Sequence, residues 1–420
     1  MRFSSASLRY LLSAVALVGL SAASAPRGDV LIVDQNDGPG TDYTYLYGAL
    51  EAAALGDTLL LRSNEVPFTT PDGFSFRVNK TLTIAAEEGA TVKLGNYIRV
   101  EFLAPGDRVV LRGLTFVDQP FSLDFTAVVL RQNEGSVWIE DCDFPALGTG
   151  NFTILESRWG AGLTATDSVD VVIARSTFRG NPTGTFDQLT SPGIDAVNST
   201  IHVYDSLIVG GFREPDEGSQ TGSGAAGVRL HDSTFFASGT SIQGGEGQPA
   251  QIFFCGSNGG EGLLLESGAN VATLLDCTLA GGAPGTDPCP DSVVGAESLV
   301  LSGTLAEPSG TARSFETSGP VAAGGSIDLT FTGEPGDLTF LLALSTVQTV
   351  PVPGAVGPLL GVPSVLVNLG PLPPSGELAL SAPGVDVPFG TSLTVTVQSL
   401  FLGVSEAVFG PGSAATFFNL

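Results

Sequence analysis

An acid, a cation and a titratable ring form the most promising chemical group in this sequence. They are Asp195, Arg229 and His231, in a chain with only two histidines among 420 residues. The segments GIDAVN and GVRLHD alternate in the way a strand with one buried face does, so we expect Asp195 and Arg229 to point outward from neighbouring repeats, with His231 two residues from Arg229. Such a group could remove a proton and stabilise the resulting charge. The alternative is a surface salt bridge beside an exposed histidine, contributing roughly 0–1 kcal/mol.

Two other pairs of side chains are candidates for binding. Trp138 and Tyr204 are expected on outward strand faces, where aromatic rings can contact sugars. Asp216 and Glu217, in the loop REPDEGSQTGSG, could hold a cation such as Ca²⁺. The alternative is a solvated acidic loop, because the chain has no D-x-[DN]-x-[DN]-G calcium motif. No other cofactor is predicted.

Four cysteines suggest a disulfide in an oxidising compartment. Cys255 and Cys289 lie seven and six residues before Gly262 and Gly295, which start successive repeats. Equivalent corners of stacked strands are about 4.8 Å apart, within disulfide reach, so we predict a Cys255–Cys289 bond. Cys142 and Cys277 lie several repeats apart and are expected to be reduced and buried.

A repeat of 31 to 35 residues must position all of these side chains. Its clearest copy, GLTATDSVDVVIARSTFRG, contains apolar residues that alternate over short runs, such as Val169, Val171 and Ile173. Short alternating strands joined by glycine-rich corners indicate an all-β protein and, at this period, a right-handed parallel β-helix. The expected coils start at Asn96, Ala127, Gly162, Gly193, Gly227, Gly262 and Gly295.

Stacked coils also predict columns of equivalent side chains. Arg175 is expected between Asp141 and Asp205 as a ladder of charges. The expected inward columns are Phe144, Phe178, Ile208, Ile242 and Leu279, and the small residues Cys142, Ser176, Ser206 and Cys277.

The chain divides into four predicted parts. Residues 1–25 resemble a signal peptide, with a basic start, a short apolar stretch and Ala23-Ser24-Ala25 as a cleavage site. Residues 26–60 form an N-terminal cap with a short amphipathic helix over Thr44–Leu55, and residues 61–297 form the β-helix. Residues 298–420 lack the coil period and are expected to form an antiparallel β-sandwich-like domain.

A helix followed by GDTLLL and then coils resembles the pectate-lyase-like family of secreted β-helix proteins. This resemblance implies the fold, and it implies a polysaccharide lyase or a glycoside hydrolase as one possible activity. The family's catalytic motifs are incomplete here. Val137-Trp138-Ile139-Glu140-Asp141 lacks the histidine of V-W-I-D-H, and Arg213 to Gly218 lacks the second arginine of R-x-P-x-x-R. The polygalacturonase strings N-T-D, G-H-G and R-I-K do not occur.

Charge and hydropathy restrict the partners. A formal net charge of −26 disfavours nucleic acid, because phosphate binding depends on clustered lysines and arginines. No segment after the signal peptide is long and apolar enough to anchor the chain in a membrane. We therefore expect an exported, monomeric bacterial protein of one of two classes. The first is a non-enzymatic scaffold or adhesion protein that contacts polysaccharide or cell-surface material, and the second is a polysaccharide lyase or hydrolase.

Overall fold

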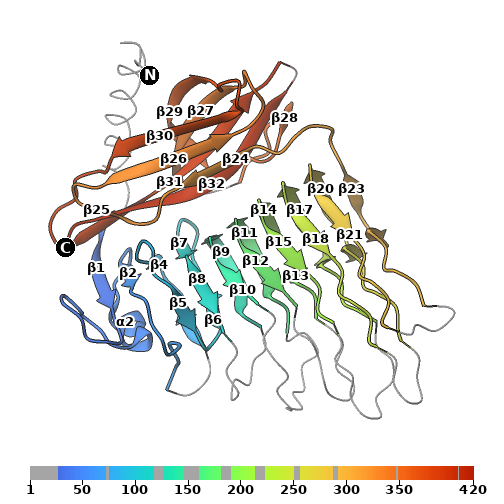
Figure 1. The fold of residues 1–420 in the computed structure, drawn as a ribbon, viewed down its shortest axis with the longest axis horizontal. Coiled ribbons are helices and arrows are strands. Elements are labelled where there is room, and N and C mark those ends of the chain that lie inside the picture. Colours follow the sequence, from blue (N-terminus) through green and yellow to red (C-terminus); the bar gives the residue numbers. More distant parts are fainter. Residues whose placement is uncertain are drawn as a thin grey trace.

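The protein is an all-β molecule in two parts, a right-handed parallel β-helix and a C-terminal antiparallel domain that lies along one side of it (Figure 1). The computed structural model describes residues 27–71, 75–117, 126–145, 160–180, 191–212, 223–249, 256–286, 292–346, 349–404 and 406–420. The predicted signal peptide, residues 1–25, lies outside the described residues.

The β-helix has three walls of parallel strands, named here A, B and C. Wall A contains β3 (Phe76–Val78), β6 (Ile98–Glu101), the first halves of β9 (Val128–Glu140) and β11 (Leu163–Ala174), β13 (Ile194–Val197), β16 (Val228–His231), β19 (Leu263–Ser267) and β22 (Ser298–Val300). Wall B contains β1 (Arg27–Val33), β2 (Thr58–Leu61), β4 (Leu82–Ala86), β7 (Arg108–Arg112), the second halves of β9 and β11, β14 (Thr200–Tyr204), β17 (Thr234–Ser238), β20 (Val271–Leu275) and β23 (Thr304–Ala306). Wall C contains β5 (Val92–Leu94), β8 (Leu114–Phe116), β10 (Asp143–Phe144), β12 (Thr177–Arg179), β15 (Leu207–Val209), β18 (Ser241–Gln243) and β21 (Thr278–Ala280).

The strand register agrees with most of the expected coil starts. The residues directly after Ala127, Gly162, Gly193, Gly227 and Gly262 pair with one another along wall A. The two looser copies, predicted to start at Asn96 and Gly295, are displaced. Ile98 and Ser298 pair with these residues along wall A, so the observed coils start at residues 97 and 297.

An apolar column runs through the interior of wall C. Phe144, Phe178, Ile208, Ile242 and Leu279 pair in this order, as predicted, and all except the half-buried Leu279 are fully buried. Phe116 extends the column, with its ring centroid 4.8 Å from that of Phe144, which lies 4.5 Å from that of Phe178. Such contacts between aromatic rings stabilise the fold beyond the hydrophobic contribution of burying the rings.

Left-handed corners followed by small inward residues turn each coil. At the corner from wall B to wall C the backbone φ is positive at Asp141, Arg175, Asp205 and Asp276, and Asp is among the residues that tolerate this conformation best. The next residues form the predicted small column. The backbone N–H groups of Cys142, Ser176 and Ser206 each donate to the hydroxyl of the next coil, as from Cys142 N to Ser176 Oγ at 3.2 Å. Thr240 joins this column between Ser206 and Cys277.

The simple alternation fails at one residue of β11. Val171 and Ile173 are buried as expected, but Val169 is 52% exposed. The register against β9 shifts between Ser168 and Asp170, so Ser168 takes the inward position and Val169 and Asp170 both lie on the outer side. The prediction that Val169 points inward is therefore wrong.

The β-helix is longer at both ends than the sequence suggested. β1 and β2 pair in parallel with each other and then with β4, so part of residues 26–60 belongs to the first coils. The predicted helix is present as α2 (Leu46–Ala52), and its buried face joins the β-helix core. At the other end, parallel pairing continues through β22 and β23 to Ala306, past the expected boundary at residue 297.

The C-terminal domain is a sandwich of two antiparallel sheets. Its large sheet contains β27 (Leu338–Thr346), β29 (Val362–Pro371), β31 (Thr391–Leu402) and β32 (Ala407–Phe418), with the short β25 (Val321–Ala322) and β28 (Ala355–Val356) paired in parallel with β32. Its small sheet contains β24 (Ser314–Thr317), β26 (Ser326–Thr332) and β30 (Glu377–Pro383). An apolar core that includes Phe315, Phe331 and Phe401 fills the space between the sheets.

Candidate functional site

The structure pairs the acid and the cation of the predicted catalytic group with each other. Asp195 and Arg229 occupy the same position of adjacent coils, as expected, and Arg229 donates two hydrogen bonds to the Asp195 carboxylate, at 3.0 and 2.9 Å. Asp195 is 1% exposed, so the expectation that it lies on an exposed face is wrong. His231 contacts the next coil instead, through Glu266 at 2.9 Å and Ser267 at 3.0 Å. This arrangement is a salt bridge beside a histidine–carboxylate contact, and both oxygens of Asp195 accept hydrogen bonds from Arg229.

The predicted carbohydrate-binding aromatics are covered by the C-terminal domain. Trp138 and Tyr204 point outward from wall B, but both are 0% exposed. They pack in an apolar cluster with residues of the large sheet, including Leu360 and Phe409. Gly412 permits the closest approach, because a Cβ there would lie 2.6 Å from the Trp138 ring. The prediction that these rings are accessible to sugars is therefore wrong.

The partial catalytic motif around Glu140 is part of the same interface. Glu140 is fully buried and accepts hydrogen bonds from the backbone N–H of Ala414 at 2.7 Å and from Ser413 Oγ at 2.8 Å. Arg175 bridges Glu140 at 3.3 Å and Asp141 at 2.7 Å, while Asp205, its other expected partner, accepts a hydrogen bond from Ser314 instead. Arg112 also contacts Asp141, at 3.2 Å. We call Arg112, Glu140, Asp141 and Arg175 the interface ion cluster, and its geometry indicates docking rather than catalysis.

The remaining predicted residues are only partly described. Asp216, Glu217, Cys255 and Cys289 lie outside the described residues, so the cation site and the disulfide stay predictions. Cys142 and Cys277 are free thiols. Cys142 is buried, and burial raises the pKa of its thiol to about 12, but Cys277 is only half-buried, contrary to expectation. In the described part of the chain, no helix is long and apolar enough to cross a membrane.

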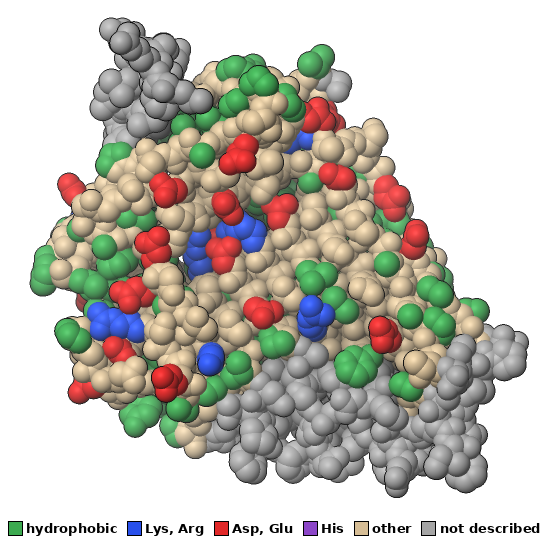
Figure 2. Space-filling model, in the orientation of Figure 1, with side chains coloured by type: hydrophobic (Ala, Val, Ile, Leu, Met, Phe, Trp, Pro, Cys, Tyr) green, Lys and Arg blue, Asp and Glu red, His purple; other side chains and the backbone are tan. Residues whose placement is uncertain are grey.

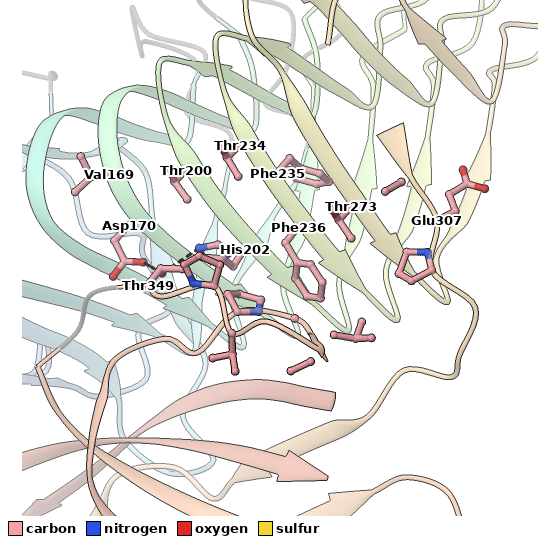
Figure 3. Close-up of a pocket in the computed structure, with 18 of the residues that line it drawn as sticks. Val169, Asp170, Thr200, His202, Thr234, Phe235, Phe236, Thr273, Glu307 and Thr349 are labelled. Carbon is pink, nitrogen blue, oxygen red and sulfur yellow. Dashed lines mark hydrogen bonds between the residues drawn. The ribbon is translucent and has the colours of Figure 1, made fainter. Parts of the chain in front are cut away.

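A cleft of about 1080 Å³ opens where the C-terminal domain diverges from wall B (Figure 3). One side is formed by outward residues of successive strands, among them Thr200 on β14, Thr234 on β17 and Thr273 on β20. The other side is formed by a C-terminal segment from Thr349 to Pro358. Between β11 and β23 the lining strands take four steps of about 4.8 Å, so this stretch of the cleft is about 19 Å long. We call it the interdomain cleft.

A hydrogen-bonded chain of three residues lies in the wall of the interdomain cleft. Thr349 Oγ1 donates to Asp170 Oδ1 at 2.6 Å and lies 3.1 Å from His202 Nε2 (Figure 3). Asp170 is 4% exposed and His202 2% exposed. The other atom of each group, Asp170 Oδ2 and His202 Nδ1, is buried without a hydrogen-bond partner. Unpartnered buried polar atoms are rare in folded proteins and call for an explanation, such as a ligand or water that the site accepts.

Burial shifts the proton affinities of both groups. It raises the pKa of Asp170 to about 6, against the opposing effect of the hydrogen bond from Thr349. It lowers the pKa of His202 to about 4, so the imidazole is neutral at physiological pH. A carboxyl group that titrates near neutrality beside a cleft is a common mark of a functional site.

The interdomain cleft is acidic. Glu134, Asp170 and Glu307 line it, and no lysine or arginine is among its described lining residues. Acidic side chains are also spread over both domains on the face shown in Figure 2. No group of three or more His, Cys, Asp or Glu side chains within the described ranges is placed to hold a metal ion.

Sequence reasoning did not select Asp170, Thr349 or His202 as a site. Alternation along the strand IHVY does place His202 outward. Alternation also places Asp170 outward, next to the inward Val171, but Thr349 is 179 residues from Asp170 in the chain. Only the docking of the C-terminal domain brings the three together.

Comparisons with known proteins give no close relative. No protein-family model matches the chain, and no curated protein matches its sequence. Among solved structures it is similar to the enzymatically active domain of tailspike protein 2 of bacteriophage CBA120, with 11% identity and a TM-score of 0.33 over 87% of this chain and 62% of that chain. It is also similar to full-length tailspike protein 2 from an Escherichia coli O157:H7 bacteriophage, with 10% identity and a TM-score of 0.28 over 88% of this chain and 56% of that one. The chain thus spans less than two thirds of either tailspike chain, and likeness at this level says nothing about activity.

Proposed function

We propose that this protein is exported, belongs with the secreted pectate-lyase-like β-helix proteins, and binds a glycan in the interdomain cleft. The observation that carries the proposal is the combination of an elongated cleft with the two buried, unpartnered polar atoms of Asp170 and His202 along its wall. Ligand sites are concave and mostly apolar, with a few precisely placed polar groups, and this cleft has that character.

The neighbouring side chains support an extended sugar polymer as the ligand. Thr200 and Thr234 pair directly on adjacent strands, and Thr273 lies one coil further along, in the column of His202. Each hydroxyl can donate and accept hydrogen bonds, which suits the many hydroxyls of a saccharide. The three hydroxyls span two steps, about 10 Å, within a stretch of cleft of about 19 Å, which suits several sugar units rather than one.

A glycan panel tests the proposal. The secreted chain should bind at least one oligosaccharide, and Thr234→Trp should abolish this binding by filling the cleft, since Thr234 is exposed within it. Thr278→Trp is the matched control, because Thr278 is equally exposed but lies on wall C. Equal binding by wild type and Thr234→Trp, or no binding to any oligosaccharide, would contradict the proposal.

One observation also favours a second candidate, the hydrolysis of glycosidic bonds. Glycosidases use a pair of carboxyl groups, one of them with a raised pKa as the proton donor. Asp170 has such a pKa, and Glu134 and Glu307 line the same cleft. Elimination by a lyase is less well supported, because no described lining residue is an arginine or lysine that could stabilise the developing charge. Release of reducing sugars that is lost in Asp170→Asn would establish hydrolysis.

A further inference from the structure

The charge of the interdomain cleft restricts which glycans it can take. Its described lining residues include three carboxylates, Glu134, Asp170 and Glu307, and no lysine or arginine. Arg108 shares the outward column of Asp170 but lies two coils away, with Ser136 between them. It donates hydrogen bonds to Thr396 Oγ1 at 2.7 Å and Thr394 O at 3.3 Å, so its guanidinium is directed to the C-terminal domain. Nothing within this lining offsets the negative charge.

The hydrogen bonds among Thr349, Asp170 and His202 determine whether the two unpartnered atoms can donate or accept. An ionised Asp170 can only accept, so the Thr349 hydroxyl donates to it and must itself accept from His202 Nε2–H. His202 Nδ1 then carries no proton, and both unpartnered atoms, Asp170 Oδ2 and His202 Nδ1, are acceptors. These two atoms therefore offer no donor, and the charge of the carboxylate is negative.

A protonated amine complements this environment more fully than a neutral hydroxyl or a carboxylate. An ammonium group offers three donors, no acceptor and a positive charge. A hydroxyl could donate one hydrogen bond but would leave the buried carboxylate without a counter-charge, which is costly at low dielectric. A uronic-acid carboxylate would add a like charge and no donor.

We infer that the interdomain cleft selects glycans that carry protonated amino groups over neutral glycans and over polymers of uronic acids. The inference rests on the proposed function and names the chemical class of its ligand. An amino group would lie against Asp170, while Glu134 and Glu307 attract further amino groups along the chain. This preference is opposite to the one that a pectate-binding protein would have.

Three oligosaccharides of equal length test the inference by calorimetric titration of the full secreted chain. They are a β-1,4-linked glucosamine hexamer, its fully N-acetylated counterpart and a galacturonic acid hexamer, at low ionic strength and at a pH slightly above the pKa of about 6 of Asp170. The glucosamine hexamer should bind at least about tenfold more tightly than the N-acetylated one, which has the same backbone without the charge. The galacturonic acid hexamer should not bind, and added salt should weaken the binding of glucosamine.

Substitutions separate the site from general electrostatic attraction. Asp170→Asn should weaken binding of the glucosamine hexamer about tenfold or more and change that of the N-acetylated hexamer by less than about twofold. The double variant Glu134→Gln, Glu307→Gln should also weaken glucosamine binding, whereas Glu377→Gln, an exposed acid on β30, should not.

The outcomes distinguish the two proposals. Equal or tighter binding of the N-acetylated or galacturonic acid hexamer that Thr234→Trp abolishes would overturn the inference and leave the proposed function standing. Glucosamine binding that is unchanged in both Thr234→Trp and Asp170→Asn would contradict the two together. Binding that requires added Ca²⁺ and is lost with a chelator would show that a metal ion, not an amine, meets Asp170.

Discussion

At the scale of single residues, the interior of wall C is stabilised by a column of three phenylalanine rings in contact. Phe116, Phe144 and Phe178 are all buried, with centroids 4.5 to 4.8 Å apart. Each ring fills space between its neighbours in the coils above and below, so the loss of one leaves a cavity that the rigid ladder cannot close.

Truncating the third ring of this stack should therefore be costly. Phe178→Ala is expected to lower the free energy of unfolding by about 3–5 kcal/mol, measured by denaturant titration. Val169→Ala is the control, because Val169 is 52% exposed and its truncation should change the same quantity by less than about 0.5 kcal/mol. A similar effect of the two substitutions would show that Phe178 is not in the core.

Asp170 should make stability depend on pH in a definite direction. Its folded pKa of about 6 exceeds the ordinary value of 3.8, so the stability it contributes is fully present below pH 3.8 and is lost as the pH rises through about 6. His202 acts in the opposite direction, because its folded pKa of about 4 lies below 6.5 and its contribution is lost as the pH falls through about 4. Glu134 and Glu307 are the other acidic groups among the described residues that line the same cleft.

Comparison with Asp170→Asn isolates the carboxyl group, since His202, Glu134 and Glu307 are present in both proteins. The free energy of unfolding of the wild type, relative to that of the variant, should fall between about pH 4 and pH 6 by up to about 3 kcal/mol. Denaturant titrations across this range measure the difference. A difference that stays constant, or that rises with pH, would show that Asp170 is not buried as described.

At the scale of elements, the outer face of wall B and the large sheet of the C-terminal domain form one interface. Apolar contacts around Trp138 and Tyr204 adjoin the interface ion cluster, in which Glu140 meets both a backbone N–H and a hydroxyl of β32. A buried charged group is tolerated when all of its partners are present. Removing that group leaves the charges and polar groups of its partners buried without compensation, which lowers stability.

Glu140→Ala should accordingly loosen the C-terminal domain. We expect a loss of about 3–5 kcal/mol in the free energy of unfolding and faster proteolysis of the segment between β23 and β24. Glu88→Ala, which removes an exposed acid, should change neither quantity appreciably. Unaltered unfolding and proteolysis in Glu140→Ala would mean that the two domains do not dock through this residue.

The predicted disulfide would join two of the last coils. A Cys255–Cys289 bond would close a loop of about 33 residues, for which chain entropy suggests a stabilisation of about 3–4 kcal/mol. Peptide mapping without reduction should find this crosslink, with Cys142 and Cys277 as free thiols. A free thiol at Cys255, or a bond from Cys142 to Cys277, would contradict the expected register of these corners.

At the scale of the whole molecule, the sequence predicted the β-helix well because its coils are local and repetitive. Alternation and spacing placed Phe144, Phe178 and Ile208 in one buried column, as the strand pairing confirms. The same logic gave the Asp195–Arg229 pairing but not the burial of Asp195. Alternation reports which face of a strand points outward, and it does not report what covers that face.

The sequence did carry one signal for the covered face that simple alternation overlooks. The segments RVVLR, SVWIE and DVVIA have adjacent apolar residues on both sides of the strand, a pattern typical of strands buried on both faces. Trp138 belongs to such a run and is buried. The interdomain cleft could not be predicted in this way, because Asp170 and Thr349 meet only after two domains of different architecture dock.

The central claim is that the interdomain cleft is where this protein binds a glycan, and a crystal structure of the complex tests it most directly. Crystals grown with the tightest-binding hexamer should show its sugar units between wall B and residues 349–358, with a polar group within hydrogen-bonding distance of Asp170 Oδ2. A hexamer bound on wall A or wall C, with the cleft unoccupied, would contradict the account.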